Sequence, residues 1–104
     1  MGNMVKAKNY KEHLLKQLKK PEEAAYLNAA LNDDDPRVFL LALRDIAEAK
    51  GGMGWLAHQA DLNRENLYRT LSLKGNPRFF NLLAVLDAIG LELTIRARRK
   101  SIRA

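Results

Sequence analysis

The sequence predicts an all-α protein of five to six short helices, with one short β-strand near its C-terminus. Two observations indicate the helices: apolar residues recur at intervals of three and four along several segments, and proline, glycine or asparagine stands where those segments begin or end. A third observation indicates the strand, because apolar and polar residues alternate only after Gly90. The chain has 104 residues, which is enough for one domain with its own core.

Two helices are expected before residue 32. Residues 1–9 show no periodicity and are expected to fray, whereas residues 10–18 have the spacing of a short amphipathic helix. Pro21 opens the next helix, because a proline in the first turn removes no helical hydrogen bond.

A third helix is expected to form the centre of the core. Asp35 is a suitable N-cap and Pro36 the first helical residue, and a broad apolar stripe follows. Gly51 and Gly52 are expected to end this helix in a left-handed or extended turn.

Residues 53–71 have the spacing of a helix-turn-helix, with the turn at residues 61–63. Asp61 tolerates a left-handed backbone better than most residues, and the side chain of Asn63 can cap the second helix. We therefore expect a lambda-repressor-like helix-turn-helix. Its apolar seam is predicted to contain Leu56, Ala57, Ala60, Leu62, Leu67 and Leu71.

The second of these helices leaves polar side chains free for DNA. Arginine pairs with guanine and asparagine with adenine, so the predicted base-reading residues are Arg64, Asn66, Tyr68 and Arg69. Other side chains and nearby backbone amides suit phosphate, and the residues predicted for that contact are Gln59, Lys74, Asn76 and Arg78. Helix pairs of this kind also occur in proteins that never bind DNA, so that interpretation stays open.

The last helix and the strand follow. Asn76 can cap this helix, Pro77 can begin it and Gly90 can close it. The alternation beyond it predicts a strand whose apolar residues are Leu91, Leu93 and Ile95. Because no second strand is evident, we expect pairing with the same strand of another copy, giving a two-fold homodimer, or with a different protein.

The net charge of +6 is unevenly placed. Residues 1–50 hold nine Lys/Arg against eight Asp/Glu, and residues 51–104 hold nine against four, which is +1 against +5. The excess therefore lies on the half that contains the helix pair, as attraction to phosphate requires, although a basic half can also be a solvated surface. The expected division is a basic segment with a short helix at 1–20, a helix-turn-helix DNA-binding domain at 21–97, and a basic tail at 98–104.

Several classes of protein are not expected. The chain has no cysteine, and His13 and His58 lack a second ligand at helical spacing, so neither a metal nor a cofactor is predicted. The sequence shows no paired carboxylates, no nucleophile with a base and no glycine-rich phosphate loop, so an enzyme is not expected. The short apolar runs predict no membrane span and no secretory signal, and thus a soluble cytoplasmic protein.

Two pieces of the chain carry a family resemblance: Asn-Arg-Glu-Asn-Leu-Tyr-Arg at 63–69 and Gly-Asn-Pro at 75–77. Together with Asp35-Pro36 and Ala88-Ile-Gly-Leu91, they make the chain resemble the antidote (antitoxin) proteins of bacterial and prophage toxin-antitoxin modules, of the Xre-like helix-turn-helix class. The resemblance runs from Pro21 to about Ile95. It is weakest at residues 1–20, and Phe80-Asn81 stands where the family usually has a smaller or hydroxyl-bearing residue.

The resemblance implies a repressor that binds operator DNA upstream of its own operon and neutralises a RelE/ParE-like toxin encoded beside it. Residues 64–69 would then be the reading surface, and a homodimer would read a near-palindrome. By elimination, toxin binding falls to residues 10–50. The alternatives are a stand-alone prophage or operon regulator without a toxin, and a protein-interaction module.

Overall fold

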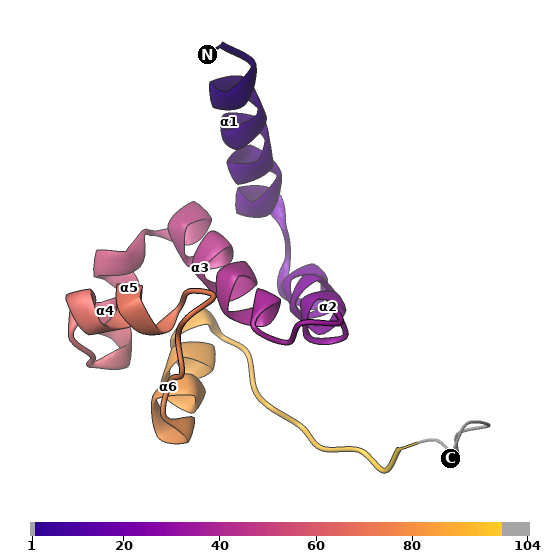
Figure 1. Cartoon of the computed structure of the whole chain (residues 1–104), viewed down its shortest axis with the longest axis vertical. Helices are drawn as coiled ribbons and strands as arrows, with labels where there is room; N and C mark the ends of the chain where they lie inside the picture. The colour runs from indigo at the N-terminus through magenta and orange to yellow at the C-terminus, as the bar shows by residue number, and fades with distance from the viewer. Residues whose placement is uncertain (1, 99–104) are drawn as a thin grey trace.

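The computed structural model describes residues 2–98 and shows six helices there (Figure 1). The predicted all-helical class and the number of helices are confirmed. The elements are α1 (Gly2–Gln17), α2 (Lys20–Leu31), α3 (Val38–Lys50), α4 (Met53–Ala60), α5 (Arg64–Thr70) and α6 (Phe79–Ile89). None of these helices is both long enough and apolar enough to cross a membrane.

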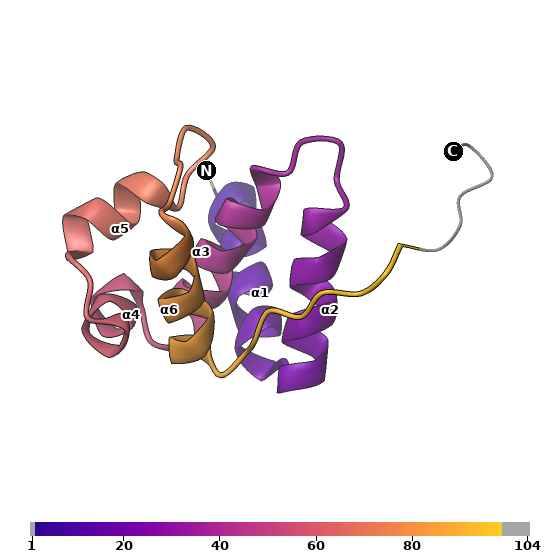
Figure 2. The same cartoon turned by 90° about the horizontal axis from the view of Figure 1, so that it is seen from below.

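Helix α3 is the centre of the molecule, as its apolar stripe predicts. It packs against α1, α2 and α4, and α4 in turn packs against α5 and α6. Figures 1 and 2 show α1 and α2 on one side of α3, and the other three helices on its opposite side. Leu43, Ile46 and Ala47 of α3 are completely buried, so the stripe is covered on both sides.

The first helix is longer than predicted, because α1 begins at Gly2 and not near residue 10. Residues 1–9 lack apolar periodicity, but periodicity reports which face of a helix is buried and not whether a helix forms. Met4, Lys6, Ala7 and Lys8 are all good helix formers. The expectation of a frayed segment was therefore wrong for residues 2–9.

Helix α3 begins at Val38, two residues later than predicted. Asp35 does organise the approach to this helix: its Oδ1 accepts hydrogen bonds from the backbone N–H of Arg37 at 3.0 Å and from its guanidinium at 2.9 Å. The Arg37 guanidinium and N–H together hold the pKa of this carboxyl below its usual range. Pro36 thus lies in a tight turn before the helix and not in its first turn.

The predicted C-terminal strand is not seen within residues 2–98. After α6 the chain continues as an irregular segment through residue 98. Leu93 and Ile95, predicted to lie on a strand, are 45% and 94% exposed. A strand needs a neighbouring strand for its backbone groups, and the described part of the chain offers none. Of the predicted basic tail, residues 99–104 lie outside the described residues.

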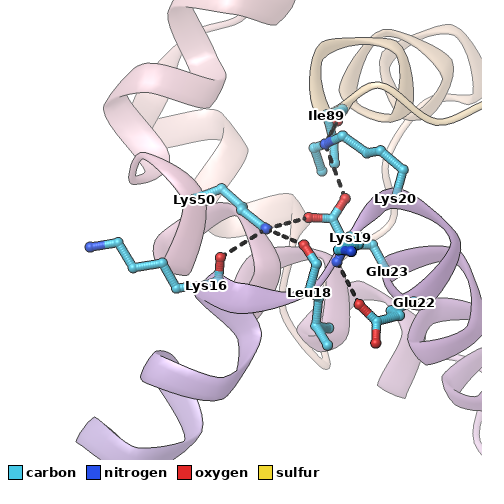
Figure 3. Close-up of polar contacts among 8 residues, drawn as sticks. All are labelled: Lys16, Leu18, Lys19, Lys20, Glu22, Glu23, Lys50 and Ile89. Atoms are coloured by element: carbon cyan, nitrogen blue, oxygen red, sulfur yellow. Dashed lines mark hydrogen bonds and ion pairs between the residues drawn. The ribbon is translucent and has the colours of Figure 1, made fainter.

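A buried carboxylate joins the ends of several helices (Figure 3). Glu23 of α2 is completely buried. Lys50 Nζ, at the end of α3, lies 3.0 Å from its Oε2, and Lys20 Nζ lies 3.1 Å from its Oε1. The Lys50 contact is an ion pair whose geometry is not that of a hydrogen bond. A buried charge costs several kcal/mol without a partner, so these two lysines account for its place in the core.

Both lysines also cap carbonyl groups at helix ends. Lys50 Nζ donates to the carbonyl of Leu18 at 2.6 Å and to that of Lys16 at 3.1 Å, where α1 ends. Lys20 Nζ donates to the carbonyl of Ile89, the last residue of α6. This polar cluster therefore links α1, α2, α3 and α6. We call it the Glu23 cluster.

We expect Lys50→Met to lower the free energy of unfolding by about 2 to 3 kcal/mol, because it leaves Glu23 with one lysine and two carbonyls without a donor. Lys16→Met is the matched control, since the Lys16 side chain is exposed and points away from the cluster (Figure 3). Urea unfolding followed by circular dichroism measures both. Equal stability of the two variants would show that the cluster does not stabilise the fold.

Candidate nucleic-acid interface

The candidate site is built on α4, a three-residue turn and α5. Asp61 ends α4 with φ 57° and ψ 48°, the left-handed conformation that its residue type tolerates. Asn63 precedes α5, and its Oδ1 accepts a hydrogen bond from the backbone N–H of Asn66 at 2.9 Å. The predicted turn and cap are both confirmed. They fix where α5 begins and which of its residues face away from α4.

The predicted seam lies beneath this turn. Leu56, Ala57, Leu67 and Leu71 are buried, whereas the remaining two members, Ala60 and Leu62, are half-buried. Leu71 stands just after α5 and is nevertheless 1% exposed. The apolar residues therefore hold α5 against α4 by one side only, which leaves the opposite side to polar residues.

Three of the four predicted base-reading side chains are exposed on α5: Arg64, Asn66 and Arg69. Arg69 Nη2 donates to Asn66 Oδ1 at 2.8 Å, so these two side chains lie together on one edge of the helix. An amide and a guanidinium held side by side present several donors to an acceptor-rich surface such as the edge of a guanine.

The fourth predicted residue, Tyr68, is half-buried and packs against the core. The guanidinium carbons of Arg44 and Arg64 lie 5.0 Å and 5.8 Å from its ring centre, within range of cation–π attraction. Sequence reasoning missed Arg44, which belongs to α3. No local pattern could have found it, because the contact joins residues that are distant in the chain.

The predicted phosphate contacts come from separate elements. Gln59 is exposed on α4, whereas Lys74 and Asn76 are exposed in the loop at 71–78, and Arg78 immediately precedes α6. Helix α6 begins at Phe79, so the expected cap at Asn76 and helix start at Pro77 were wrong. Figure 2 shows the loop rising between α5 and α6, next to the end of α5.

Gly75 determines the shape of that loop. Its N–H donates to the carbonyl of Ser72 at 2.9 Å, and a Cβ at this position would lie 1.8 Å from the carbonyl oxygen of Thr70. No other residue fits so close to the backbone. The first position of the Gly-Asn-Pro motif therefore requires glycine for steric reasons. The close approach of this glycine to Thr70 also determines where the neighbouring residues Lys74 and Asn76 lie.

The cations at the site take no part in the ion pairs of the structure. Among residues 10–98, whose side chains the structure describes, the five ion pairs all join residues between Lys11 and Lys50. In this part of the chain, no ion pair involves the four cations of α5 and the loop at 71–78: Arg64, Arg69, Lys74 and Arg78. Their positive potential is therefore available to an anionic partner.

Fold and site define a small basic helical protein with a cationic helix exposed after a tight turn. The family model described as "Probable addiction module antidote protein" matches residues 9–97. The chain is also 35% identical over 99 residues to an uncharacterized protein of Haemophilus influenzae, with 95% of this chain and 98% of that relative covered. No solved structure matches.

The chain therefore belongs to the family of probable addiction module antidote proteins. An antidote acts against a toxin, so membership in this family implies a toxin partner in general terms.

We expect Gly75→Ala to lower the free energy of unfolding by about 2 kcal/mol, because the new methyl group forces the loop away from Thr70. Gly54→Ala is the control: a Cβ there would meet Arg64 at an ordinary 3.7 Å, within helix α4. That change should stabilise the protein by about 0.5 to 1 kcal/mol. Thermal unfolding compares them, and a stable Gly75→Ala variant would contradict the steric argument.

Proposed function

We propose that this chain is a DNA-binding antitoxin that represses its own operon and neutralises a toxin encoded beside it. The observation that carries the proposal is the exposed face of α5, where Arg64, Asn66 and Arg69 project without an acidic ion-pair partner among residues 10–98. The turn before α5 and the apolar seam behind it are the features of an Xre-like helix-turn-helix. Membership in the antidote family supports the same proposal.

In this proposal α5 enters the major groove. Arg69 and Asn66 read base edges from one edge of the helix, and Arg64 reads from its first turn. Tyr68, held by Arg44 and Arg64, presents only part of its ring and mainly sets the position of Arg64. A homodimer places two such helices about 34 Å apart, so the operator is a near-palindrome with half-sites one turn apart.

Contacts to phosphate hold the protein on the duplex without reading sequence. Lys74, Asn76 and Arg78 lie on the α6 side of α5, and Gln59 lies on α4. Such contacts contribute affinity that depends on salt and is similar for all sequences. The loop that Gly75 shapes thus orients the protein, while α5 supplies the discrimination.

Toxin binding is assigned to the near-neutral half of the chain. A shallow groove there is lined by Tyr26, Ala29 and Ala30 of α2 and by Val38 and Leu41 of α3. At its edge Lys11 and Asp45 form an ion pair of 2.9 Å, and hydrogen bonding to Asp45 raises the pKa of Lys11. An apolar groove with neutral edges suits a protein partner better than DNA. We propose that a RelE/ParE-like toxin covers it.

The first experiment is fluorescence anisotropy of the purified protein on the DNA upstream of its gene and on a scrambled duplex, at two salt concentrations. Tighter binding to the upstream DNA, with affinity that falls steeply as salt rises, supports an autoregulating DNA binder. Equal, weak binding to both duplexes would contradict sequence-specific repression.

We expect Arg69→Ala to weaken operator binding by roughly 1 to 3 kcal/mol, with little change on random DNA, if the guanidinium forks onto a guanine. Lys74→Ala should instead weaken both by a similar factor, because a phosphate contact does not depend on sequence. Lys16→Ala removes one exposed charge from α1 and serves as control. Equal losses on operator and random DNA for Arg69→Ala would refute base reading by this residue.

We expect Ala29→Arg to weaken capture of the neighbouring gene's product at least about tenfold, because a long charged side chain fills the groove on α2. Ala25→Arg is the matched control, since Ala25 is exposed on the same helix and does not line this groove. Co-purification and calorimetry measure capture, and operator binding checks that the variants fold. Capture that is unaffected by Ala29→Arg would place the toxin elsewhere.

A further inference from the structure

The segment at 91–98 leaves both apolar side chains and backbone groups uncovered. Ile95 is 94% exposed and Leu93 45% exposed. Within the described chain, the backbone groups of residues 92–98 make no hydrogen bond. A run of this kind has the character of an unpaired sheet edge, which invites another extended chain.

The start of the segment is held firmly. Gly90 adopts the left-handed conformation with φ 94°, and the N–H of Leu91 donates to the carbonyl of Leu86 at 2.8 Å. Leu91 packs against the core, and Lys20 lies beside Gly90 while it caps Ile89. Figure 2 shows the segment leaving the end of α6, passing α2 and continuing away from the body. Its direction of exit is therefore set by the fold.

The first part of the segment lies along a groove formed with α2 and α3. Leu91 and Leu93 line a groove together with Leu27 and Leu31 of α2 and Phe39 of α3. Side chains two residues apart share a face of an extended chain, so Ile95 continues this apolar face beyond the groove. Glu92, Thr94 and Arg96 alternate with these apolar residues, and Glu92 and Thr94 also line the groove. The uncovered apolar surface thus runs from the groove, where Leu31 of α2 is 46% exposed, along the segment to Ile95.

We infer that residues 91–97 pair antiparallel with the same residues of a second copy, with the two-fold axis at Thr94. This inference deepens the proposed function, because it rests on the homodimer proposed there and specifies how the two copies join. Pairing satisfies the backbone groups of both segments and covers Ile95 of each copy. The segment becomes a strand only in the dimer, which accounts for its irregular form in one chain.

Charge and shape select the register. With the axis at Thr94, Glu92 lies opposite Arg96 of the second copy, and Leu93 opposite Ile95, each pair occurring twice. An axis at Leu93 would remove both ion pairs. An axis at Ile95 would set Glu92 opposite Arg98, but it would leave Leu93 opposite the small side chain of Ala97. An axis between two residues would set apolar side chains against polar ones. Of these registers, only the one at Thr94 combines the Glu92–Arg96 ion pairs with the pairing of the two large apolar side chains, Leu93 and Ile95.

A charge swap tests the ion pairs. Glu92→Arg and Arg96→Glu each set like charges opposite each other twice, so each should weaken dimerisation at least about tenfold. The double variant Glu92→Arg with Arg96→Glu restores opposite charges and should restore the dimer. Sedimentation equilibrium at low salt measures all four proteins. A monomeric wild type, or a double variant no better than the single ones, would overturn the inference.

Cysteine cross-linking tests the axis, because the natural chain contains no cysteine. Thr94→Cys places two thiols directly opposite each other, within the reach of a disulfide, and should give a covalent dimer under mild oxidation. Leu93→Cys is the control, since its thiols are offset by two residues along the strands. Equal cross-linking of both variants, or none at Thr94→Cys, would refute this register.

The same variants separate this inference from the proposed function. Circular dichroism checks their helical content, and anisotropy on the upstream DNA is measured alongside. Specific DNA binding without the predicted pattern of dimerisation and cross-linking would overturn the inference and leave the function standing. The predicted pattern with no preference for the upstream DNA would support the inference and refute the function.

Discussion

The pairing of the Glu23 carboxylate with Lys50 and Lys20 is the interaction on which the arrangement of the helices depends. Three helices, α1, α3 and α6, end at this cluster, and α2 begins there. The ends of helices carry partial negative charge and their beginnings partial positive charge. The lysines therefore lie at the negative ends and Glu23 at the positive one. The two lysines that pair with this carboxylate thus supply donors to carbonyl groups at the ends of α1 and α6.

This cluster also connects the two sides of the molecule. Lys50 joins the end of α1 to α3, and Lys20 joins the start of α2 to the end of α6. Helix α6 packs on α4, which carries α5. The Glu23 cluster therefore helps to fix the position of the exposed helix α5. It also helps to fix the point at which the segment at 91–98 leaves the body. Surface and segment are fixed relative to each other through the core.

What could be predicted from the sequence was local. The turn at Asp61, the cap at Asn63 and the apolar seam depend on residues close together in the chain, and all were found. Contacts between distant residues were not: Lys20 with Ile89, or Arg44 with Tyr68, leave no periodic signal. Gly75 stood out only as part of the Gly-Asn-Pro motif, and the Thr70 carbonyl that requires a glycine there is visible only in three dimensions. The strand prediction was wrong for a similar reason. An alternating pattern forms a strand only beside a second strand, and the described part of this chain contains none.

Ion pairing explains why the two halves differ more at their surfaces than their residue counts suggest. In the half that ends at Lys50, cations such as Lys11, Arg37 and Arg44 are each matched by a carboxylate within about one hydrogen-bond length. These pairs cancel local fields, and exposed pairs of this kind contribute little to stability. The cations of α5 and the loop at 71–78 meet no such carboxylate among residues 10–98, so their field extends into solvent. The side formed by α5 and the loop at 71–78 therefore suits an anionic partner. The half that ends at Lys50, where charges are paired, suits a protein partner, as proposed above.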